Sequence, residues 1–331
     1  MISPKKFLFY VTIILLFTIF LSIKNGAVET SFYDLFKIDD DNLNNYVLLN
    51  IRLPRLVMGL IVGAALSICG ASMQGLFRNP LADPGLIGIT SGATLAVGTL
   101  IVLFPTFLEG IFGLYALSIA AFSGAMITAV IITLIASKSS QLSIVHVLLC
   151  GIAINAIAGS LTGLLTYFST DDQLRTLTFW TMGSISGSMW SQVMVCSSLV
   201  IPCLFIINRC AVGLNLLSLG EEPAVYVGLN YHQLKLCILI TVSIAIGACV
   251  AVSGFIGFIG LVIPHIIRQF VGPNHKTLLP LSALLGSTLL VLSDLVARVI
   301  IAPAEMPVGL ITSTIGGPVF LYMVIKQFSR R

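Results

Sequence analysis

The sequence predicts an all-α, polytopic membrane protein, and three observations support that prediction. Of the 331 residues, 57% are hydrophobic and only 9% are charged, whereas soluble domains carry about 25% charged residues. The mean hydropathy of +1.06 lies far outside the soluble range. Several segments run for about 20 residues without a charge, which is the length a helix needs to cross the hydrocarbon core. We therefore expect a single transmembrane domain over residues 1–331.

The first half of the chain supplies five expected spans. Residues 7–23 follow Lys5 and Lys6, and no small-residue cleavage site comes after them, so we expect a retained span rather than a signal peptide. A polar loop, acidic at 39–41, is expected over 27–50. The second span, at about 53–75, carries Gly59-x-x-x-Gly63, which predicts close packing against another helix. The next three expected spans are residues 85–103, 114–135 and 144–167.

The second half supplies the remaining spans. A polar loop is expected around Asp171, Asp172 and Arg175, followed by an aromatic, Gly/Ser-rich re-entry over 179–190. The later spans are expected at residues 191–207, 234–252, 253–272, 278–300 and 307–325. This gives about ten spans, so both termini are expected on the same side of the membrane.

Two segments break the helical pattern. Residues 76–93 contain Pro80 and Pro84, and the glycine-rich stretch 253–272 contains Pro264. Irregular backbone at membrane depth is tolerated only where it is buried in protein or lines water. Each broken segment follows a glycine-rich span, and an extra sixth span lies between the two sets. This arrangement favours an inverted repeat of helices 2–5 and 7–10, as in many transporters.

The charges of the loops predict the orientation. The positive-inside rule places the side richer in Lys and Arg in the cytoplasm. That side is the side of the termini, with Lys5, Lys6, Arg78, Lys138, Arg209, Lys235, Arg268, Lys276, Lys326, Arg330 and Arg331. The other side holds Lys24, Lys37, Arg52, Arg55, Arg175 and Arg298. The slight positive balance of +4 reflects these loops and does not indicate nucleic-acid binding.

The longest polar interruption in the second half is residues 213–231, between two membrane-length segments. It carries Glu221 and Glu222 followed by Pro223, a residue that suits the first turn of a helix. Gly220 and Gly228 can end such a helix on either side. We expect a short cytoplasmic surface helix that a partner grips; a plain connecting loop is the alternative.

Five blocks resemble one known family. They are RLPR at 52–55, QGLFRNPLADPGLIGITSGA at 74–93, LGEEPAVYVGL at 219–229, GFIGLVIPHIIR at 257–268 and MPVGLITSTIGGPVFLYMV at 306–324. In order and spacing the chain resembles the permease subunit of type II ABC importers for iron–siderophores, haem and cobalamin. The resemblance implies a BtuC-like fold of ten helices in the bacterial inner membrane.

The resemblance also implies partners. These are a second permease subunit, two cytoplasmic ATPases that use ATP and Mg²⁺, and a periplasmic binding protein. It places the ATPase-coupling motif on Leu219, Gly220, Glu221, Glu222, Ala224 and Gly228. It places binding-protein docking on Arg52, Arg55 and Arg298, since arginine makes bidentate pairs with carboxylates. The alternative for each arginine is ordinary snorkelling to the headgroups.

The cargo is indicated only by the block after the fifth span, which resembles haem permeases of the family. Arg175 is a candidate for steering haem propionates at the pore entrance; pairing with Asp171 or Asp172 is the alternative. We expect haem, with ferric siderophores or cobalamin as alternatives. The seven cysteines are not spaced for a metal site.

Three other classes of protein are alternatives: an ion-coupled secondary transporter, a membrane enzyme and a channel, although no filter-like loop of a channel appears in the sequence. An ion-coupled secondary transporter needs intramembrane acids, and Asp294 is the one acid within a span, with Arg298 four residues on to neutralise it. An enzyme needs catalytic or nucleotide-binding motifs, and the chain contains no HExxH, GxSxG or GxxxxGK[ST]. We therefore expect a non-enzymatic membrane subunit that binds no cofactor and draws its energy from a separate ATPase.

Overall fold

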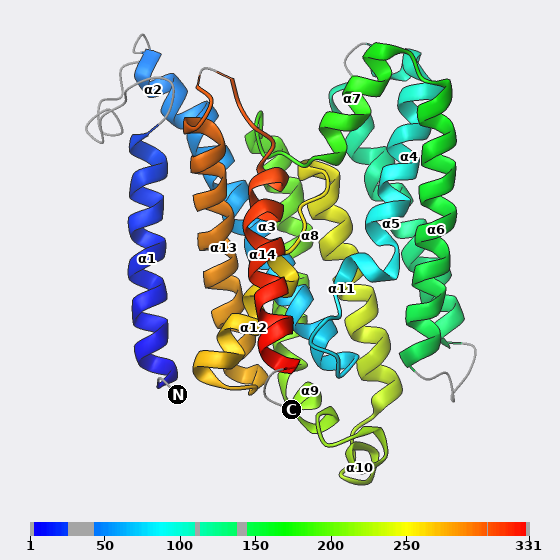
Figure 1. Cartoon of the computed structure of the whole chain (residues 1–331), viewed down its shortest axis with the longest axis vertical. Helices are drawn as coiled ribbons and strands as arrows, with labels where there is room; N and C mark the ends of the chain where they lie inside the picture. Colours follow the sequence, from blue (N-terminus) through cyan, green and yellow to red (C-terminus); the bar gives the residue numbers. More distant parts are fainter. Residues whose placement is uncertain (1–2, 26–42, 110–112, 138–143, 303, 329–331) are drawn as a thin grey trace.

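The computed structural model describes residues 3–25, 43–109, 113–137, 144–302 and 304–328, which fold into helices and connecting turns (Figure 1). The α-helices are α1 (Pro4–Lys24), α2 (Leu43–Val47), α3 (Leu53–Leu76), α4 (Ile89–Leu103), α5 (Gly113–Ser137), α6 (Ile144–Phe168), α7 (Asp171–Thr181), α8 (Trp190–Arg209), α9 (Ala211–Leu217), α10 (Glu221–Tyr226), α11 (Tyr231–Ser253), α12 (Ile259–Val271), α13 (His275–Val299) and α14 (Val308–Phe328). A π-helical turn at Leu48–Arg52 leads into α3, and 3₁₀ turns occupy Pro84–Ile87 and Pro105–Leu108.

Within the described residues, 7 helices are long and apolar enough to cross a membrane. These are α1, α3 with the turns before it, α5, α6, α8, α11 and α13. Three shorter apolar helices, at Ile89–Leu103, Ile259–Val271 and Val308–Tyr322, correspond to the remaining expected spans. The all-helical membrane fold is therefore confirmed.

Helix α3 is the centre of the packing, and small residues allow its neighbours to approach. A Cβ added to Gly63 would lie 2.5 Å from the backbone oxygen of Gly286 on α13, which is closer than real Cβ contacts come. A Cβ added to Gly70 would likewise collide with the backbone oxygen of Gly260 on α12. The close-packing face that the sequence predicts for this span is therefore observed, and it extends about two turns beyond Gly63, to Gly70.

The two broken segments lie against each other. The chain between α3 and α4 turns at Asp83, whose carboxylate accepts the Gly85 N–H at 2.8 Å. Burial nevertheless raises the pKa of Asp83 above its usual value. On α3, Gln74 donates to the carbonyl of Leu261 at 3.2 Å and accepts a hydrogen bond from Arg268 of α12. The Asp83 carboxylate thus satisfies an N–H of the irregular backbone inside the protein, and Gln74 joins α3 to α12.

Two expected loops prove to be partly helical. Residues 171–175, expected as a polar loop, form the start of α7, because Thr170 and Gln173 make a capping box and Asp171 and Asp172 lie in the first turn. Of the expected loop at 27–50, residues 43–50 are helical. The acidic run at 39–41 lies outside the described residues.

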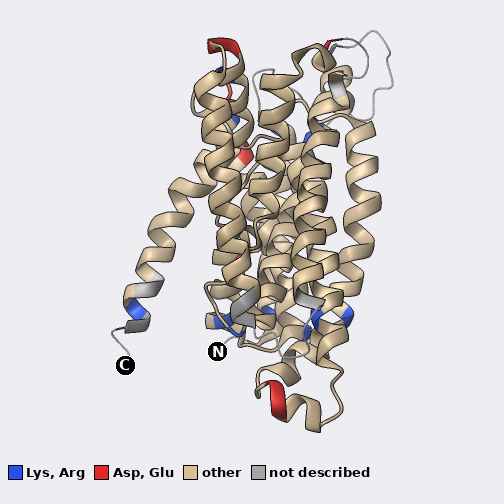
Figure 2. Cartoon of the chain, turned by 90° about the vertical axis from the view of Figure 1, so that its right-hand side faces the viewer, with Lys and Arg blue, Asp and Glu red and all other residues tan. Residues whose placement is uncertain are grey.

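Most of the charged residues lie toward the two ends of the molecule, and most of the middle is uncharged (Figure 2). Helix α1 begins and α14 ends at the end that carries α10 (Figure 1). We call this the α10 end. Helix α3 begins and α13 ends at the opposite end, so Arg52, Arg55 and Arg298 share that opposite end.

Candidate functional site

Helix α10 projects beyond the spans as a short element of 6 residues. Gly220 precedes it at φ 120° and Gly228 follows it at φ 96°, conformations that L side chains rarely adopt. The glycines that the sequence singles out therefore set the entry and exit of this helix. Ala224 is fully buried, and its carbonyl accepts the N–H of Leu229 at 3.0 Å. The predicted short surface helix is present.

The outward side of α10 is apolar. Tyr226 is 90% exposed, and Val225, Val227 and Leu219 are also exposed. Of the two acids, Glu222 is exposed, and Glu221 lies 3.5 Å from Arg78, a half-exposed pair of small energetic value. Exposed apolar side chains at the tip of a membrane protein indicate a contact surface for another protein. The sequence motif does not single out Tyr226, although the exposure of Tyr226 follows from its facing away from the buried Ala224.

Helix α9 fixes this element to the membrane bundle. Leu214 and Leu217 are fully buried. The Asn215 carboxamide accepts the backbone N–H of His275 at 2.8 Å and donates to the Asn274 side chain at 2.8 Å. Asn274 caps the start of α13. Since α10 follows α9 after a three-residue turn, α9 connects α10 to the first turn of α13.

At the opposite end, Arg55 binds two carboxylates. Its Nε lies 2.9 and 3.1 Å from the two oxygens of Asp294, and its Nη2 lies 2.8 Å from the same carboxylate. Its Nη1 lies 2.9 and 3.0 Å from the oxygens of Glu305. The Arg55 side chain is only 6% exposed, whereas that of Glu305 is 40% exposed. We call Arg55, Asp294, Arg298 and Glu305 the outer ion-pair network.

The other two arginines are also engaged within the chain. Arg298 lies 3.2 Å from Asp294 through its Nε and donates to the Ser22 hydroxyl of α1 at 2.7 Å. The i,i+4 pairing of Asp294 with Arg298 that the sequence suggests is therefore formed. Arg52 donates to the carbonyls of Ile23 at 2.5 Å and Lys24 at 3.3 Å, where α1 ends. The arginines thus hold α1, α3 and α13 together.

Glu305 is the most accessible member of the outer ion-pair network, and the sequence analysis missed it. It lies in the turn before α14 and accepts a hydrogen bond from Ser186 in the segment between α7 and α8. Burial alone would raise the pKa of Glu305, but the hydrogen bonds from Ser186 and Arg55 and the positive charge of Arg55 outweigh it, so the pKa is lowered. Glu305 therefore joins segments far apart in the sequence.

Arg175 lies exposed on α7, and its guanidinium stacks over the ring of Phe179 at 5.7 Å. Among the ion pairs of the described residues, none joins Arg175 to Asp171 or Asp172. The cation–π contact leaves the N–H groups of the guanidinium free to face outward. Within the described residues, no group of three or more His, Cys, Asp or Glu side chains is arranged to hold a metal ion.

Comparison with known proteins gives consistent matches along the whole chain. The FecCD transport family matches residues 14–326. The hemin transport system permease protein HmuU of Yersinia pestis is 46% identical over 331 residues, covering 100% of this chain and 98% of that protein. The vitamin B12 import system permease protein BtuC of Vibrio vulnificus is 39% identical over 282 residues, covering 85% of this chain and 83% of that protein.

A solved structure also matches. It is described as an inward-facing conformation of a metal-chelate type ABC transporter. The TM-score is 0.87 at 34% sequence identity, with 97% of this chain and 99% of that chain covered.

Proposed function

We propose, from the premise that the chain belongs to the FecCD transport family, that it is the permease subunit of an ATP-driven importer that carries haem into the cytoplasm. The family is one of ABC transporter permeases, and its members are membrane subunits of transporters. Haem is favoured because the 46% identity to a hemin permease extends over 100% of the chain. The vitamin B12 permease of Vibrio vulnificus is less similar, at 39% identity over 85% of the chain.

One observation carries the proposed mechanism: α10 projects from the bundle with an apolar, exposed surface and a buried anchor at Ala224. We infer that a separate ATPase grips this helix. Closure of the ATPase on ATP would then move α10, and the α9 contacts with the start of α13 would rotate the attached spans. The proposed coupling element consists of Leu219, Gly220, Glu221, Glu222, Ala224 and Gly228. The exposure of Val225, Tyr226 and Val227 supports including them as contact residues.

The same proposal includes the architecture of the assembly. We propose ten transmembrane helices, made of the seven long and three shorter apolar helices, in a BtuC-like fold with an inverted repeat of α3–α6 and α11–α14. The α10 end, with both termini, faces the cytoplasm of a bacterial inner membrane. Two copies of the chain pair in the membrane above two cytoplasmic ATPases, which bind ATP and Mg²⁺.

Docking of a periplasmic binding protein is proposed at the opposite end, and the geometry refines how it occurs. Arg55 and Arg298 are buried and paired inside the chain, so a carboxylate from the binding protein reaches Arg55 only by displacing Glu305. Such an exchange conserves the number of charge-assisted hydrogen bonds on Arg55. Arg175, exposed at the same end, is proposed to attract the propionates of haem.

The main alternative class, an ion-coupled secondary transporter, depends on Asp294 as a proton relay. Asp294 accepts hydrogen bonds from Arg55 through both of its oxygens, and its Oδ2 lies 3.2 Å from Arg298. A proton relay needs a carboxyl group that is open to a proton donor or acceptor, and both oxygens of Asp294 are occupied by guanidinium groups of its own chain. The geometry therefore favours energy from a separate ATPase.

The test is uptake by vesicles that contain the permease, its ATPase and its binding protein. We expect haem uptake that requires ATP and the binding protein and that survives collapse of proton and sodium gradients. Ferric siderophore and cobalamin are assayed in parallel. Uptake of either in place of haem would reject haem as cargo, and uptake that stops with the ion gradient would reject the ATP-driven mechanism.

A further inference from the structure

A cavity of about 490 Å³ lies between α5, α8 and α11, away from both the coupling element and the outer ion-pair network. Its walls are mainly apolar, including Ile119, Phe122, Val195 and Ala251. A cavity of this size lies within the range of ligand-binding pockets, about 300–1,000 Å³. Neither the coupling element nor the outer ion-pair network gives this cavity a role.

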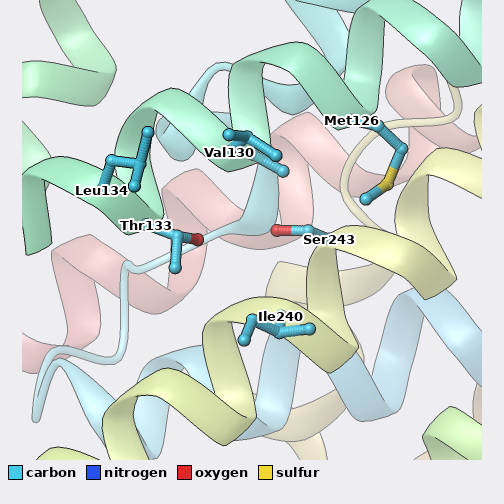
Figure 3. A pocket seen from close by; sticks show the side chains of 7 residues that line it. Met126, Val130, Thr133, Leu134, Ile240 and Ser243 are labelled. Atoms are coloured by element: carbon cyan, nitrogen blue, oxygen red, sulfur yellow. The ribbon is translucent and has the colours of Figure 1, made fainter. Parts of the chain in front are cut away.

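A second cavity, of about 270 Å³, lies further along α5 and α11. Figure 3 shows Met126, Thr133 and Leu134 of α5 across from Ile240 and Ser243 of α11. The α5 residues that line the two cavities follow each other at helical spacing on one face, from Tyr115 through Phe122 and Met126 to Thr133. The two cavities therefore lie one after the other along the contact between α5 and α11, and we call them together the groove.

The groove has the length of the apolar membrane interior. Leu134 lies nineteen positions after Tyr115, which corresponds to about 28 Å along a helix at about 1.5 Å per residue. The hydrocarbon core is about 30 Å thick. The groove narrows once, where Gly247 of α11 meets Phe122 and Ala125 of α5. Its place and length match a space that faces acyl chains.

The side chains beside the groove show where it opens. Ile119 is 61% exposed and Val195 is 62% exposed, and Ile127 and Val130 are exposed further along α5. Exposed aliphatic side chains on long apolar helices face lipid in a membrane protein. An apolar groove that opens to lipid loses dispersion contacts if it stays empty, so a hydrocarbon chain is the occupant available to it.

One end of the groove is polar. The hydroxyls of Tyr115 and Ser191 lie 3.2 Å apart, and Gln192 also lines the cavity there. Tyr115 and Ser191 lie near the starts of α5 and α8, at the ends of two long apolar helices. Tyrosine with an apolar body and a wet hydroxyl is typical of the membrane–water interface. The polar end is therefore suited to the ester and headgroup region of a lipid.

We propose that this groove binds one acyl chain of a glycerophospholipid from the leaflet opposite the α10 end. The ester region lies against Tyr115, Ser191 and Gln192, and the chain runs past Phe122 toward the second cavity. The lipid thereby fills the contact between α5 of the first half of the chain and α11 of the second half. The proposal depends on the groove alone and holds for any cargo.

The experiment uses the full chain in nanodiscs of phosphatidylethanolamine that carries a photoactivatable diazirine on one acyl chain. After irradiation, mass spectrometry identifies the labelled residues. A diazirine near the ester is expected to label the cavity around Tyr115 and Val195, and a diazirine near the chain end is expected to label the level of Met126 and Ile240. Equal labelling of both levels by both probes, or labelling no stronger than on the lipid-facing side of α1, would overturn the proposal.

A matched pair of variants completes the test. Ser118→Leu fills the groove, and Ser198→Leu makes the same change on an exposed face of α8 that does not line it. Labelling in the groove should fall to background in Ser118→Leu and stay at the wild-type level in Ser198→Leu. Unchanged labelling in Ser118→Leu would contradict the proposal, as would cross-links in the wild-type groove that join two protein chains instead of protein and lipid.

Discussion

The outer ion-pair network predicts that Asp294→Asn is among the most damaging single changes of charge in the chain. The substitution keeps the size of the side chain and removes the negative charge that Arg55 and Arg298 share. Asp294 is 4% exposed, Arg55 is 6% exposed and Arg298 is 7% exposed. Water therefore cannot replace the lost carboxylate, and two guanidinium groups remain with the single carboxylate of Glu305.

The structure also sets the expected size of the effect. Removing one partner of a buried ion pair costs about 3–5 kcal/mol, because a charge is left without compensation. Glu305→Gln removes a carboxylate that is 40% exposed, so solvent screening limits that loss to about 0–1 kcal/mol. At about 2–4 °C per kcal/mol, Asp294→Asn should lower the apparent Tm by roughly 6–20 °C, and Glu305→Gln by about 0–4 °C.

The assay is thermal unfolding of the purified protein in one detergent, and unfolding is monitored through the reactivity of the buried cysteines. Glu222→Gln provides the matched control, because it makes the same chemical change on the exposed surface of α10. It should leave Tm unchanged. If Asp294→Asn proved no more damaging than Glu222→Gln, the network would not stabilise the fold and the reasoning from burial would be refuted.

Four further predictions follow from the same structure. Tyr226→Asp, on a side chain that is 90% exposed, should leave Tm intact but weaken recovery of the ATPase in a pull-down. Gly63→Leu should lower stability by at least about 1–3 kcal/mol, read from Tm, because its Cβ would lie 2.5 Å from the Gly286 carbonyl oxygen. Glu305→Gln should tighten binding-protein docking, measured by biolayer interferometry, since Arg55 becomes available to an incoming carboxylate. The pKa of Glu305 is lowered in the folded protein. The contribution of Glu305 to stability is therefore complete above the usual glutamate pKa of about 4.3 and should disappear as the pH falls through the lower folded pKa. The Tm values of the wild type and of Glu305→Gln should therefore converge in acid.

Each of these predictions has a clear contrary result. Normal ATPase recovery with Tyr226→Asp would remove Tyr226 from the contact surface. A Gly63→Leu protein of wild-type Tm would mean that α3 and α13 are not in close contact. Weaker docking by Glu305→Gln would mean that the binding protein contacts Glu305 itself. A Tm difference that widens in acid would reverse the sign assigned to Glu305.

The spans and the coupling helix could be predicted from the sequence because their signals are local. Long uncharged runs fix the spans through the thickness of the membrane, and the helices begin and end within a few residues of the expected boundaries. Gly220, Pro223 and Gly228 predict α10 through their backbone preferences. The N-terminus of α7 was missed although the capping box of Thr170 and Gln173 is also a local signal.

The outer ion-pair network could be predicted only in part, because its contacts join distant segments. Asp294 and Arg298 are four residues apart, and helical spacing reveals that pair. Arg55 and Asp294 are 239 positions apart and Arg55 and Glu305 are 250 positions apart, and no local pattern links them. The sequence therefore assigned Arg55 and Arg298 to an external partner, whereas the structure shows that both first bind carboxylates of their own chain.

The most direct test of α10 as the link between the ATPase and the membrane helices is a measurement of ATP-driven haem uptake. The vesicles contain a permease in which Val225, Tyr226 and Val227 are all changed to serine. All three side chains are exposed, so the permease should fold and dock its binding protein as before. We predict that haem uptake is lost and that the ATPase no longer responds to the loaded binding protein. Uptake at the wild-type rate would show that α10 does not connect the motor to the membrane helices.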